Sequence, residues 1–481
     1  MDDLKQKTVT SVAWSAVDRF ASQGIQFVMS IIIARLLLPS DYGLIAMLSI
    51  FLAVAQTFVD SGFGTALIQK NDRTEVDYST AFYFNLAVAV IVYSILFVVA
   101  PFIADFYNQE KLVPVTRVVG LTLIITSLGL VQWAKLSISL DFKKLALTST
   151  IAVTISGLLG VWMAYHGYGV WSLVAQTLLN NMLNVLLLWA LSRWHPLLIF
   201  SRESFKKLFS FGSKLLLSSL LHTIYTNLYT LVIGKKFTSS ELGFFNRSST
   251  ISQFSSSNIS SVIVRAIYPI QCSMQNDDEQ LKIYFMKYLR LGCYIIFPIT
   301  IGLCSLAEPL VILILKDKWL PAVPLLQILC VAYMWNPIMM MNCSILNVKG
   351  RSDYFFHAEV IKKIVAIIIL VVTIPFGVKI MCTGLILYSF ADIYIITVYT
   401  RKLMDLRLSA QIRELLPVLL LSVSMGLWVY GSTLFFVNPL WKLLVGASVG
   451  VVYYFLVSKI ARLEEFKFLM SLIASKKIDL N

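Results

Sequence analysis

The sequence predicts an all-α protein that crosses a membrane about fourteen times. Three observations lead to this fold class. Of the 481 residues, 58% are hydrophobic and only 14% are charged, whereas soluble proteins carry about 25% charged residues. The mean hydropathy is +0.78. The apolar residues also gather in successive stretches of about 20, the length that a helix needs to cross a bilayer.

Six predicted spans form an N-terminal bundle within residues 1–200. Each is an apolar stretch, and short turns with charged, proline or glycine residues separate one span from the next. Because no turn is long enough to fold alone, the bundle has no room for a soluble domain. The six spans lie at 11–37, 41–66, 78–104, 112–139, 145–165 and 168–192.

Six further spans are predicted to form a second bundle within residues 201–405. The first two are the most polar, because they contain Lys214, Arg247 and a serine-rich run at 248–261. Polar spans usually face a bundle interior or a water-filled cavity, so we keep both as spans. The six lie at 207–234, 240–271, 281–306, 321–347, 354–376 and 378–400.

Two C-terminal spans, at 411–436 and 439–459, follow within residues 406–460, and residues 461–481 are expected to be a cytoplasmic tail. When the N-terminus is placed in the cytoplasm, more than half of the 40 lysines and arginines fall in cytoplasmic segments. Cytoplasmic loops collect basic residues, so both termini are predicted to be cytoplasmic. The same rule accounts for the net charge of +14 without a nucleic-acid partner.

The sequence predicts neither a metal nor another cofactor. Its six cysteines and four histidines follow no metal-binding or disulfide spacing. It also has no G-x-x-x-x-G-K-[ST] motif, which would bind the phosphates of ATP. We therefore expect no enzyme activity and no direct use of ATP, and coupling to a proton or sodium gradient is left open.

Two segments match at an offset of 200 residues: IIIARLLLPSDYGLIA (31–46) and LVIGKKFTSSELGFFN (231–246). Each contains an apolar helix, a basic residue, a short turn, an acidic residue and a glycine. Gly43 and Gly243 coincide, as do Asp41 and Glu241. The match predicts that the two six-helix bundles are parallel repeats around a central cavity, an arrangement that is typical of secondary transporters.

Three runs of residues carry a resemblance to a known family. They are SVAWSAVDRFASQGIQFVMSIIIARLLLPSDYGLIAM (11–47), FVDSGFGTALIQK (58–70) and YSTAFYFN (78–85). They resemble the Wzx-type polysaccharide flippases of the multidrug/oligosaccharidyl-lipid/polysaccharide exporter superfamily, and most of all the branch of lipopolysaccharide or colanic-acid-type exporters. The resemblance is strongest over residues 8–90.

The resemblance implies transport of an undecaprenyl-pyrophosphate-linked oligosaccharide from the cytoplasmic to the periplasmic leaflet of a bacterial inner membrane. It implies alternating access without nucleotide hydrolysis, in two six-helix bundles around a cationic cavity. Membrane lipid is a further implied partner, as are a polysaccharide polymerase and assembly proteins.

Charged side chains inside the predicted spans are candidate site residues, because a charge in the bilayer must face the interior, find a partner or reach a headgroup. Basic residues outnumber acidic ones there, which suits an anionic pyrophosphate. The candidates for its binding are Arg19, Lys214, Arg247, Arg265 and Arg290. The carboxylates Asp18, Asp60 and Asp392 are candidates either for ion coupling or for structural ion pairs, such as one between Asp60 and Arg19.

Uncharged polar side chains are candidates for contact with the glycan. Thr177, Asn180, Asn181 and Asn184 share one face of a helix. Tyr225 and Asn227 lie in the predicted seventh span. The alternative for all of these residues is hydrogen bonding between helices, which polar side chains provide in membranes.

Two other functions compete with the flippase. A drug or cation exporter of the same superfamily would have an acid-rich cavity, whereas the predicted spans here hold an excess of basic residues. A membrane glycosyltransferase or polymerase would need a sizeable outer loop with catalytic residues, and the predicted outer loops are short.

Overall fold

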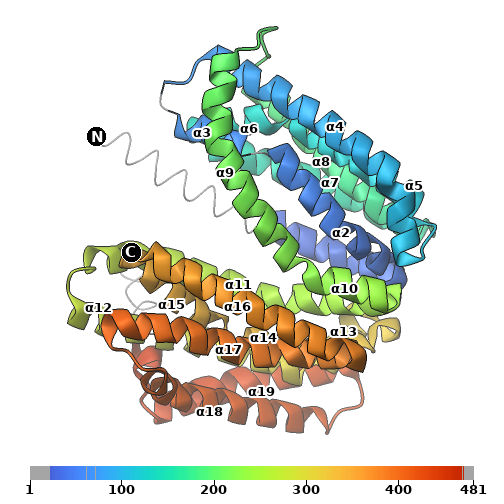
Figure 1. Cartoon of the computed structure of the whole chain (residues 1–481). Helices are drawn as coiled ribbons and strands as arrows, with labels where there is room; N and C mark the ends of the chain where they lie inside the picture. Colours follow the sequence, from blue (N-terminus) through green and yellow to red (C-terminus); the bar gives the residue numbers. More distant parts are fainter. Residues whose placement is uncertain (1–21, 61, 71, 469, 471–481) are drawn as a thin grey trace, which may run out of the picture. The chain divides into compact units, whose positions relative to one another are not determined.

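The computed structural model describes residues 22–60, 62–70, 72–468 and 470, and within these ranges every regular element is a helix (Figure 1). Ten helical stretches in this part of the chain are long and apolar enough to cross a membrane, and three of them consist of two consecutive helices. The predicted all-α, multi-pass fold class is therefore confirmed. The total of fourteen spans stays a prediction.

Four predicted spans are not among these ten. The first lies partly outside the described residues, which show a helix at Ser22–Leu36. The other three correspond to α9 (Arg202–Thr226), α11 (Ser239–Ser273) and α16 (Ser352–Thr373), which are 25, 35 and 22 residues long. These helices have the length to span a bilayer, but none of them contains a stretch of 18 residues that is both strongly apolar and nearly free of charged side chains.

The chain folds into two compact units, Met1–Gly243 and Phe244–Asn481. The boundary lies later in the chain than residue 200, where the sequence places the end of the first bundle. The reason is that α9 packs on the second span of the first unit and α10 (Leu228–Lys236) packs beside it. Besides α9 and α10, the labelled helices of the first unit are α2 (Pro39–Asp60), α3 (Phe63–Gln69), α4 (Glu75–Tyr107), α5 (Leu112–Ser127), α6 (Leu130–Ile138), α7 (Phe142–Tyr165) and α8 (Val170–Ser192).

Two predicted spans of the first unit are each two helices instead of one. The second span is α2 followed by α3, and the fourth is α5 followed by α6. Between α2 and α3, Gly62 has φ 72° and ψ 1°, the left-handed conformation that ends a helix. Between α5 and α6 lies Gly129. The sequence pattern misses both breaks because the apolar stretch resumes soon after each glycine, at Phe63 and at Leu130.

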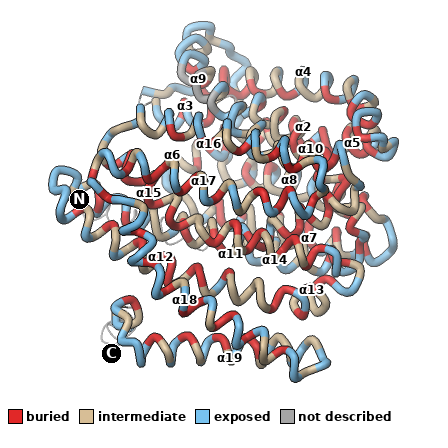
Figure 2. Tube along the Cα trace, turned by 60° about the horizontal axis from the view of Figure 1, so that its bottom comes forward, coloured by how far each residue is buried: buried red, intermediate tan, exposed pale blue. Residues whose placement is uncertain are grey.

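The second unit is built around α12 (Asp278–Ser305), which packs on α18 (Leu408–Thr433). Buried residues recur along both helices (Figure 2). The tyrosine hydroxyl of Tyr294 in α12 donates to Ser458 Oγ at 2.7 Å, which ties the last predicted span to this core. The remaining helices of the unit are α13 (Ala307–Leu315), α14 (Ala322–Tyr333), α15 (Asn336–Val348), α16, α17 (Val378–Met404) and α19 (Pro439–Ile460), with most of α11.

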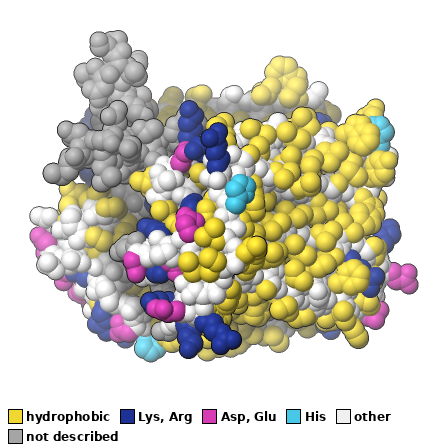
Figure 3. Space-filling view, turned by 90° about the horizontal axis from the view of Figure 1, so that it is seen from above, with side chains coloured by type: hydrophobic (Ala, Val, Ile, Leu, Met, Phe, Trp, Pro, Cys, Tyr) yellow, Lys and Arg dark blue, Asp and Glu magenta, His cyan; other side chains and the backbone are white. Residues whose placement is uncertain are grey.

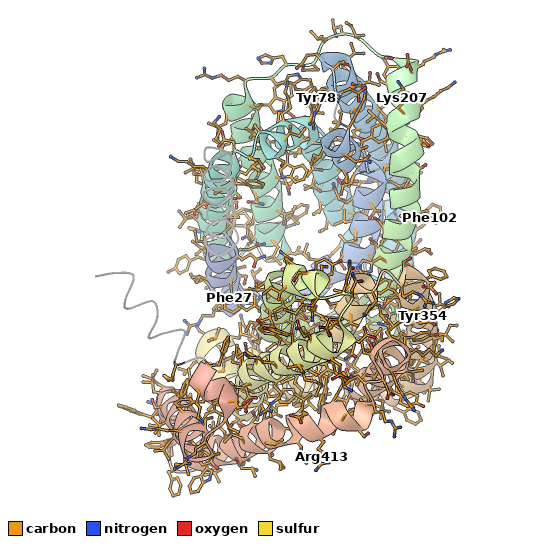
Figure 4. All side chains as sticks on the ribbon, turned by 90° about the vertical axis from the view of Figure 1, so that its left-hand side faces the viewer. Phe27, Tyr78, Phe102, Lys207, Tyr354 and Arg413 are labelled. Carbon is orange, nitrogen blue, oxygen red and sulfur yellow. The ribbon has the colours of Figure 1, made fainter. Side chains whose placement is uncertain are left out.

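Apolar side chains on the outside of the helices form the surface that lipid would meet. Val98 and Phe102 of α4 are 67% and 69% exposed. Hydrophobic side chains cover much of the face in Figure 3, and charged ones lie toward its left-hand part and along its right-hand edge. In the first unit, Tyr78 and Lys207 lie at one end, and Phe102 lies toward the other (Figure 4). This separation of apolar and charged surface is what a bilayer requires.

The two matching sequence segments adopt the same local structure. Asp41 accepts a hydrogen bond from the backbone N–H of Leu38 at 3.1 Å, and Glu241 accepts one from Thr238 at 3.0 Å. Each carboxylate therefore caps the start of its helix, α2 or α11, where negative charge is stabilised. The residues of the two caps, 38 and 41 in one and 238 and 241 in the other, are thus also 200 positions apart. The parallel repeat of the whole bundles stays a prediction.

Gly43 and Gly243, which coincide in the sequence match, also meet in space. A Cβ added to Gly43 would overlap the backbone carbonyl oxygen of Ser239, and one added to Gly243 would overlap that of Pro39. The starts of α2 and α11 therefore cross at the two glycines. Each glycine packs against the backbone at the start of the other helix.

Candidate functional site

A cavity of about 390 Å³ lies in the first unit where the two broken spans meet. Gly62 and Gly129, the glycines of the two breaks, both line it. Gly129 also allows α8 to approach, because a Cβ there would lie 2.9 Å from Val185 Cγ2. Interrupted membrane helices commonly surround binding sites, since they bring free backbone groups and polar side chains to the middle of a bundle.

The end of α2 supplies a carboxylate to this cavity. Asp60 is exposed and lines the cavity wall. Gln56, one turn earlier, donates from Nε2 to Asp60 Oδ1 at 2.8 Å. The Gln56 Oε1 atom in turn accepts a hydrogen bond from Thr126 Oγ1 of α5 at 3.3 Å. This chain of hydrogen bonds fixes the orientation of the carboxylate and joins the two broken spans next to the cavity.

The opposite wall comes from α8 and holds part of the predicted polar stripe. Asn181 and Asn184 line the cavity together with Asp60. Asn181 donates from Nδ2 to the carbonyl of Thr177 at 2.8 Å, so its amide is held in place by its own helix. The side-chain oxygen of Asn180 is buried without a hydrogen-bond partner in the described structure. The structure thus brings two of the three predicted asparagines to the carboxylate at position 60.

The other two candidates for glycan contact lie elsewhere in the first unit. Asn227 follows α9, donates to the carbonyl of Thr223 at 2.9 Å and accepts from Ser49 Oγ of α2 at 3.5 Å. Tyr225 is half-buried in the last turn of α9. Neither residue lines the cavity that contains Asp60.

The five predicted basic residues have different surroundings. Arg19, with its predicted neighbour Asp18, lies outside the described residues. Lys214 belongs to α9. In α11, Arg247 is buried and Arg265 is exposed.

Arg290, the fifth basic candidate, has two carboxylate partners. Its Nη1 lies 3.0 Å from Glu414 of α18, and its Nε lies 2.5 Å from Glu465, which is buried. The sequence could not reveal these pairs, because the partners lie more than 120 residues later in the chain. The charge of Arg290 is therefore compensated inside the second unit.

A second cavity, of about 370 Å³, lies in the second unit and contains Asp392. Lys362 of α16 lies 3.1 Å from Asp392 Oδ1, and it also contacts Glu359 one turn earlier. The side chains of Lys362 and Asp392 are only 6% and 10% exposed. Asp392 is therefore in an ion pair with Lys362, and its choice between ion coupling and a structural role stays a prediction. The sequence also did not single out Lys362 as its partner.

The two cavities are lined by corresponding predicted spans. The first is lined by spans two, four and six, and the second by spans eight, ten and twelve together with α16. Span ten is also broken, because α14 ends at Tyr333 and α15 begins at Asn336. The first cavity has a carboxylate together with two amides, whereas the second has a carboxylate that is paired with a lysine.

Comparison with known proteins places these features in a family. The family model described as "polysaccharide biosynthesis protein" matches residues 32–324. The teichuronic acid biosynthesis protein TuaB of Bacillus subtilis is 27% identical over 74% of this chain and 74% of the relative. The lipopolysaccharide biosynthesis protein WzxC of Escherichia coli is 26% identical over 75% of this chain and 73% of the relative.

The fold is also that of a solved transporter. The structure of the lipid II flippase MurJ in an inward closed conformation superposes with a TM-score of 0.75, over 96% of this chain and 100% of that one, at 12% identity. These comparisons confirm the resemblance to polysaccharide flippases that the runs within residues 11–85 indicate.

Proposed function

This chain belongs to the polysaccharide biosynthesis protein family, and from that membership we propose that it moves a lipid-linked oligosaccharide across the bacterial inner membrane. The proposed substrate is an undecaprenyl-pyrophosphate-linked repeat unit of a polysaccharide or lipopolysaccharide. It would pass from the cytoplasmic to the periplasmic leaflet by alternating access, without hydrolysis of a nucleotide. Both termini would lie in the cytoplasm, as the distribution of lysine and arginine favours.

The observation that carries this proposal is the first-unit cavity at the two helix breaks. A carbohydrate needs hydrogen-bonding side chains in a region that is otherwise apolar, and Asp60, Asn181 and Asn184 supply them. The second support is the relation to proteins named for polysaccharide biosynthesis, together with the fold shared with a lipid II flippase.

We propose that four basic residues meet the pyrophosphate: Arg19, Lys214, Arg247 and Arg265. Guanidinium groups form paired hydrogen bonds with phosphate oxygens, and such bonds are strong where water is scarce. Arg290 is left out of this set, because Glu414 and Glu465 already compensate its charge.

Replacement of Arg19 or Arg247 by alanine is expected to leave the amount of inserted protein unchanged and to lower glycan export roughly tenfold or more. The reason is that a charge-assisted hydrogen bond to the substrate contributes about 1.5–3 kcal/mol. Export is measured as surface polysaccharide in cells that depend on the variant. Lys379→Ala, at an exposed lysine of α17, is the control and should export normally. Normal export by both arginine variants would contradict a cationic binding region.

A cellular experiment tests the proposed function itself. Deletion of the gene is expected to remove the surface polysaccharide and to leave lipid-linked repeat units on the cytoplasmic side of the membrane. Re-expression of the full chain should restore the surface polysaccharide and remove the accumulated repeat units. An unchanged surface polysaccharide, in cells with no second flippase, would overturn the proposal.

An exporter of cationic compounds is the alternative that one observation favours, because the carboxylate of Asp60 lies in a cavity whose lining includes no lysine or arginine among the described residues. The two functions differ in their substrates. Increased sensitivity of the deletion strain to cationic dyes, with normal surface glycan, would support this alternative.

A further inference from the structure

We propose that the first-unit cavity is a saccharide subsite that takes a single neutral sugar unit and excludes a uronic acid. This inference rests on the proposed function and extends it to the class of sugar that one site accepts. It assigns Asp60 a role in binding sugar hydroxyls in place of ion coupling. The inference is based on three properties of the cavity: the side chains that line it, its volume and its charge.

The polar groups of the cavity complement a sugar ring. An ionised carboxylate only accepts hydrogen bonds. Asp60 can therefore accept one from each of two neighbouring sugar hydroxyls, besides the hydrogen bond that Oδ1 accepts from Gln56. The amides of Asn181 and Asn184 both donate and accept, and Thr126 adds a hydroxyl. Donors and acceptors thus come from three spans and surround one space.

Trp133 supplies an aromatic side chain to the lining of the same cavity. It lies on α6, lines the cavity and is 45% exposed. A pyranose ring has an apolar face of C–H groups, and the flat face of an indole presents a large and rigid apolar surface to it. The cavity volume of about 390 Å³ lies near the lower end of the roughly 300–1,000 Å³ that is usual for small-molecule sites. It therefore suits one sugar unit better than a whole repeat.

The charge of the cavity sets the selectivity. Asp60 is the ionisable side chain among the described lining residues. Lys135, on the same short helix as Trp133, is paired with Glu75 at 2.8 Å. A uronic acid would place a second carboxylate beside Asp60 with no cation to compensate it, and like charges at one site are unfavourable. A neutral sugar meets no such repulsion.

The proposal is tested by saturation-transfer NMR on the full-length protein in lipid nanodiscs. The probes are methyl β-glucopyranoside and methyl β-glucopyranosiduronate, which differ in the carboxylate alone. The wild type is expected to bind the glucoside roughly tenfold or more tightly than the uronate. Asp60→Asn should weaken glucoside binding and bring the ratio of the two affinities close to one. Asn184→Ala should weaken both probes without changing their ratio.

Matched controls separate a binding effect from misfolding. Asp60→Glu keeps the charge and should retain the preference for the neutral probe. Asp105→Asn, at an exposed carboxylate near the end of α4, should behave as the wild type. Each variant must elute as the wild type does on size exclusion. Equal binding of the two probes by the wild type, or an unchanged ratio in Asp60→Asn, would overturn the proposal.

The same preparations distinguish this inference from the proposed function. If surface glycan depends on the wild-type protein but the wild type does not prefer the neutral sugar, the subsite is refuted and the flippase stands. If the glucoside binds with the expected preference but export does not depend on the protein, the flippase is refuted instead. Displacement of the glucoside by tetramethylammonium, at lower concentration than by glucose, would refute the subsite in favour of a cation site.

Discussion

Replacement of Gly43 or Gly243 by alanine is expected to prevent assembly of a stable protein. At each position the added Cβ would overlap a backbone carbonyl oxygen, of Ser239 or Pro39. A backbone atom cannot turn away as a side chain can, so α2 and α11 would have to move apart. The loss should exceed the roughly 1–3 kcal/mol that is usual for an overpacked core position.

The measurement is the thermal midpoint of the purified variants, followed by size exclusion. Gly24→Ala and Gly431→Ala are the matched controls, because a Cβ at either position would have nothing within 4 Å. Both controls should unfold at the temperature of the wild type. Normal stability of Gly43→Ala would show that the two helices do not cross at these glycines.

Replacement of Lys362 by methionine is expected to be strongly destabilising. The substitution keeps a long apolar chain but removes the cation that lies 3.1 Å from Asp392. Because Asp392 is 7% exposed, its carboxylate would remain buried without compensation. Removal of one partner of a buried ion pair costs about 3–5 kcal/mol.

The double variant Lys362→Met/Asp392→Leu should recover much of this loss, since an apolar pair often replaces a buried ion pair at little cost. Lys379→Met, at an exposed lysine of α17, serves as the control for loss of a charge. The free energy of unfolding, measured in mixed micelles, is the quantity to compare. Additive effects of the two single substitutions would contradict a direct interaction between Lys362 and Asp392.

The sequence predicts the fold class because a chain with so few charges and such long apolar stretches suits a bilayer. Inside a bilayer, a helix satisfies the hydrogen bonds of its own backbone. It also identifies Gly43 and Gly243, because both matching segments have a glycine at the same position near a helix start. A glycine at such a position indicates that another backbone comes too close for a side chain. The stripe with Asn181 and Asn184 follows from helical spacing alone. The fold class and the stripe depend on residues close together in the chain, and the two glycines are found by matching two short segments that lie 200 residues apart.

The remaining features depend on packing between distant elements. Asp60 and Asn184 line one cavity together with Gly62 and Gly129, where the spans break, and a single glycine rarely signals such a break in a sequence. The partners of Arg290 come from a different span and from the segment after the last span. Arg290 and Lys362 have carboxylate partners. The number of basic residues in the predicted spans without a compensating carboxylate is therefore smaller than the sequence indicates.

The most direct test of the flippase proposal is transbilayer movement by the purified protein. The full chain is reconstituted into liposomes with an undecaprenyl-pyrophosphate-linked oligosaccharide, and exposure of the glycan at the far leaflet is followed with a membrane-impermeant lectin or glycosidase. We expect exposure that requires the protein and is lost when the pyrophosphate is replaced by an uncharged link. Exposure no faster than in protein-free liposomes, with the protein shown to be folded and several glycans tried, would contradict the proposed function.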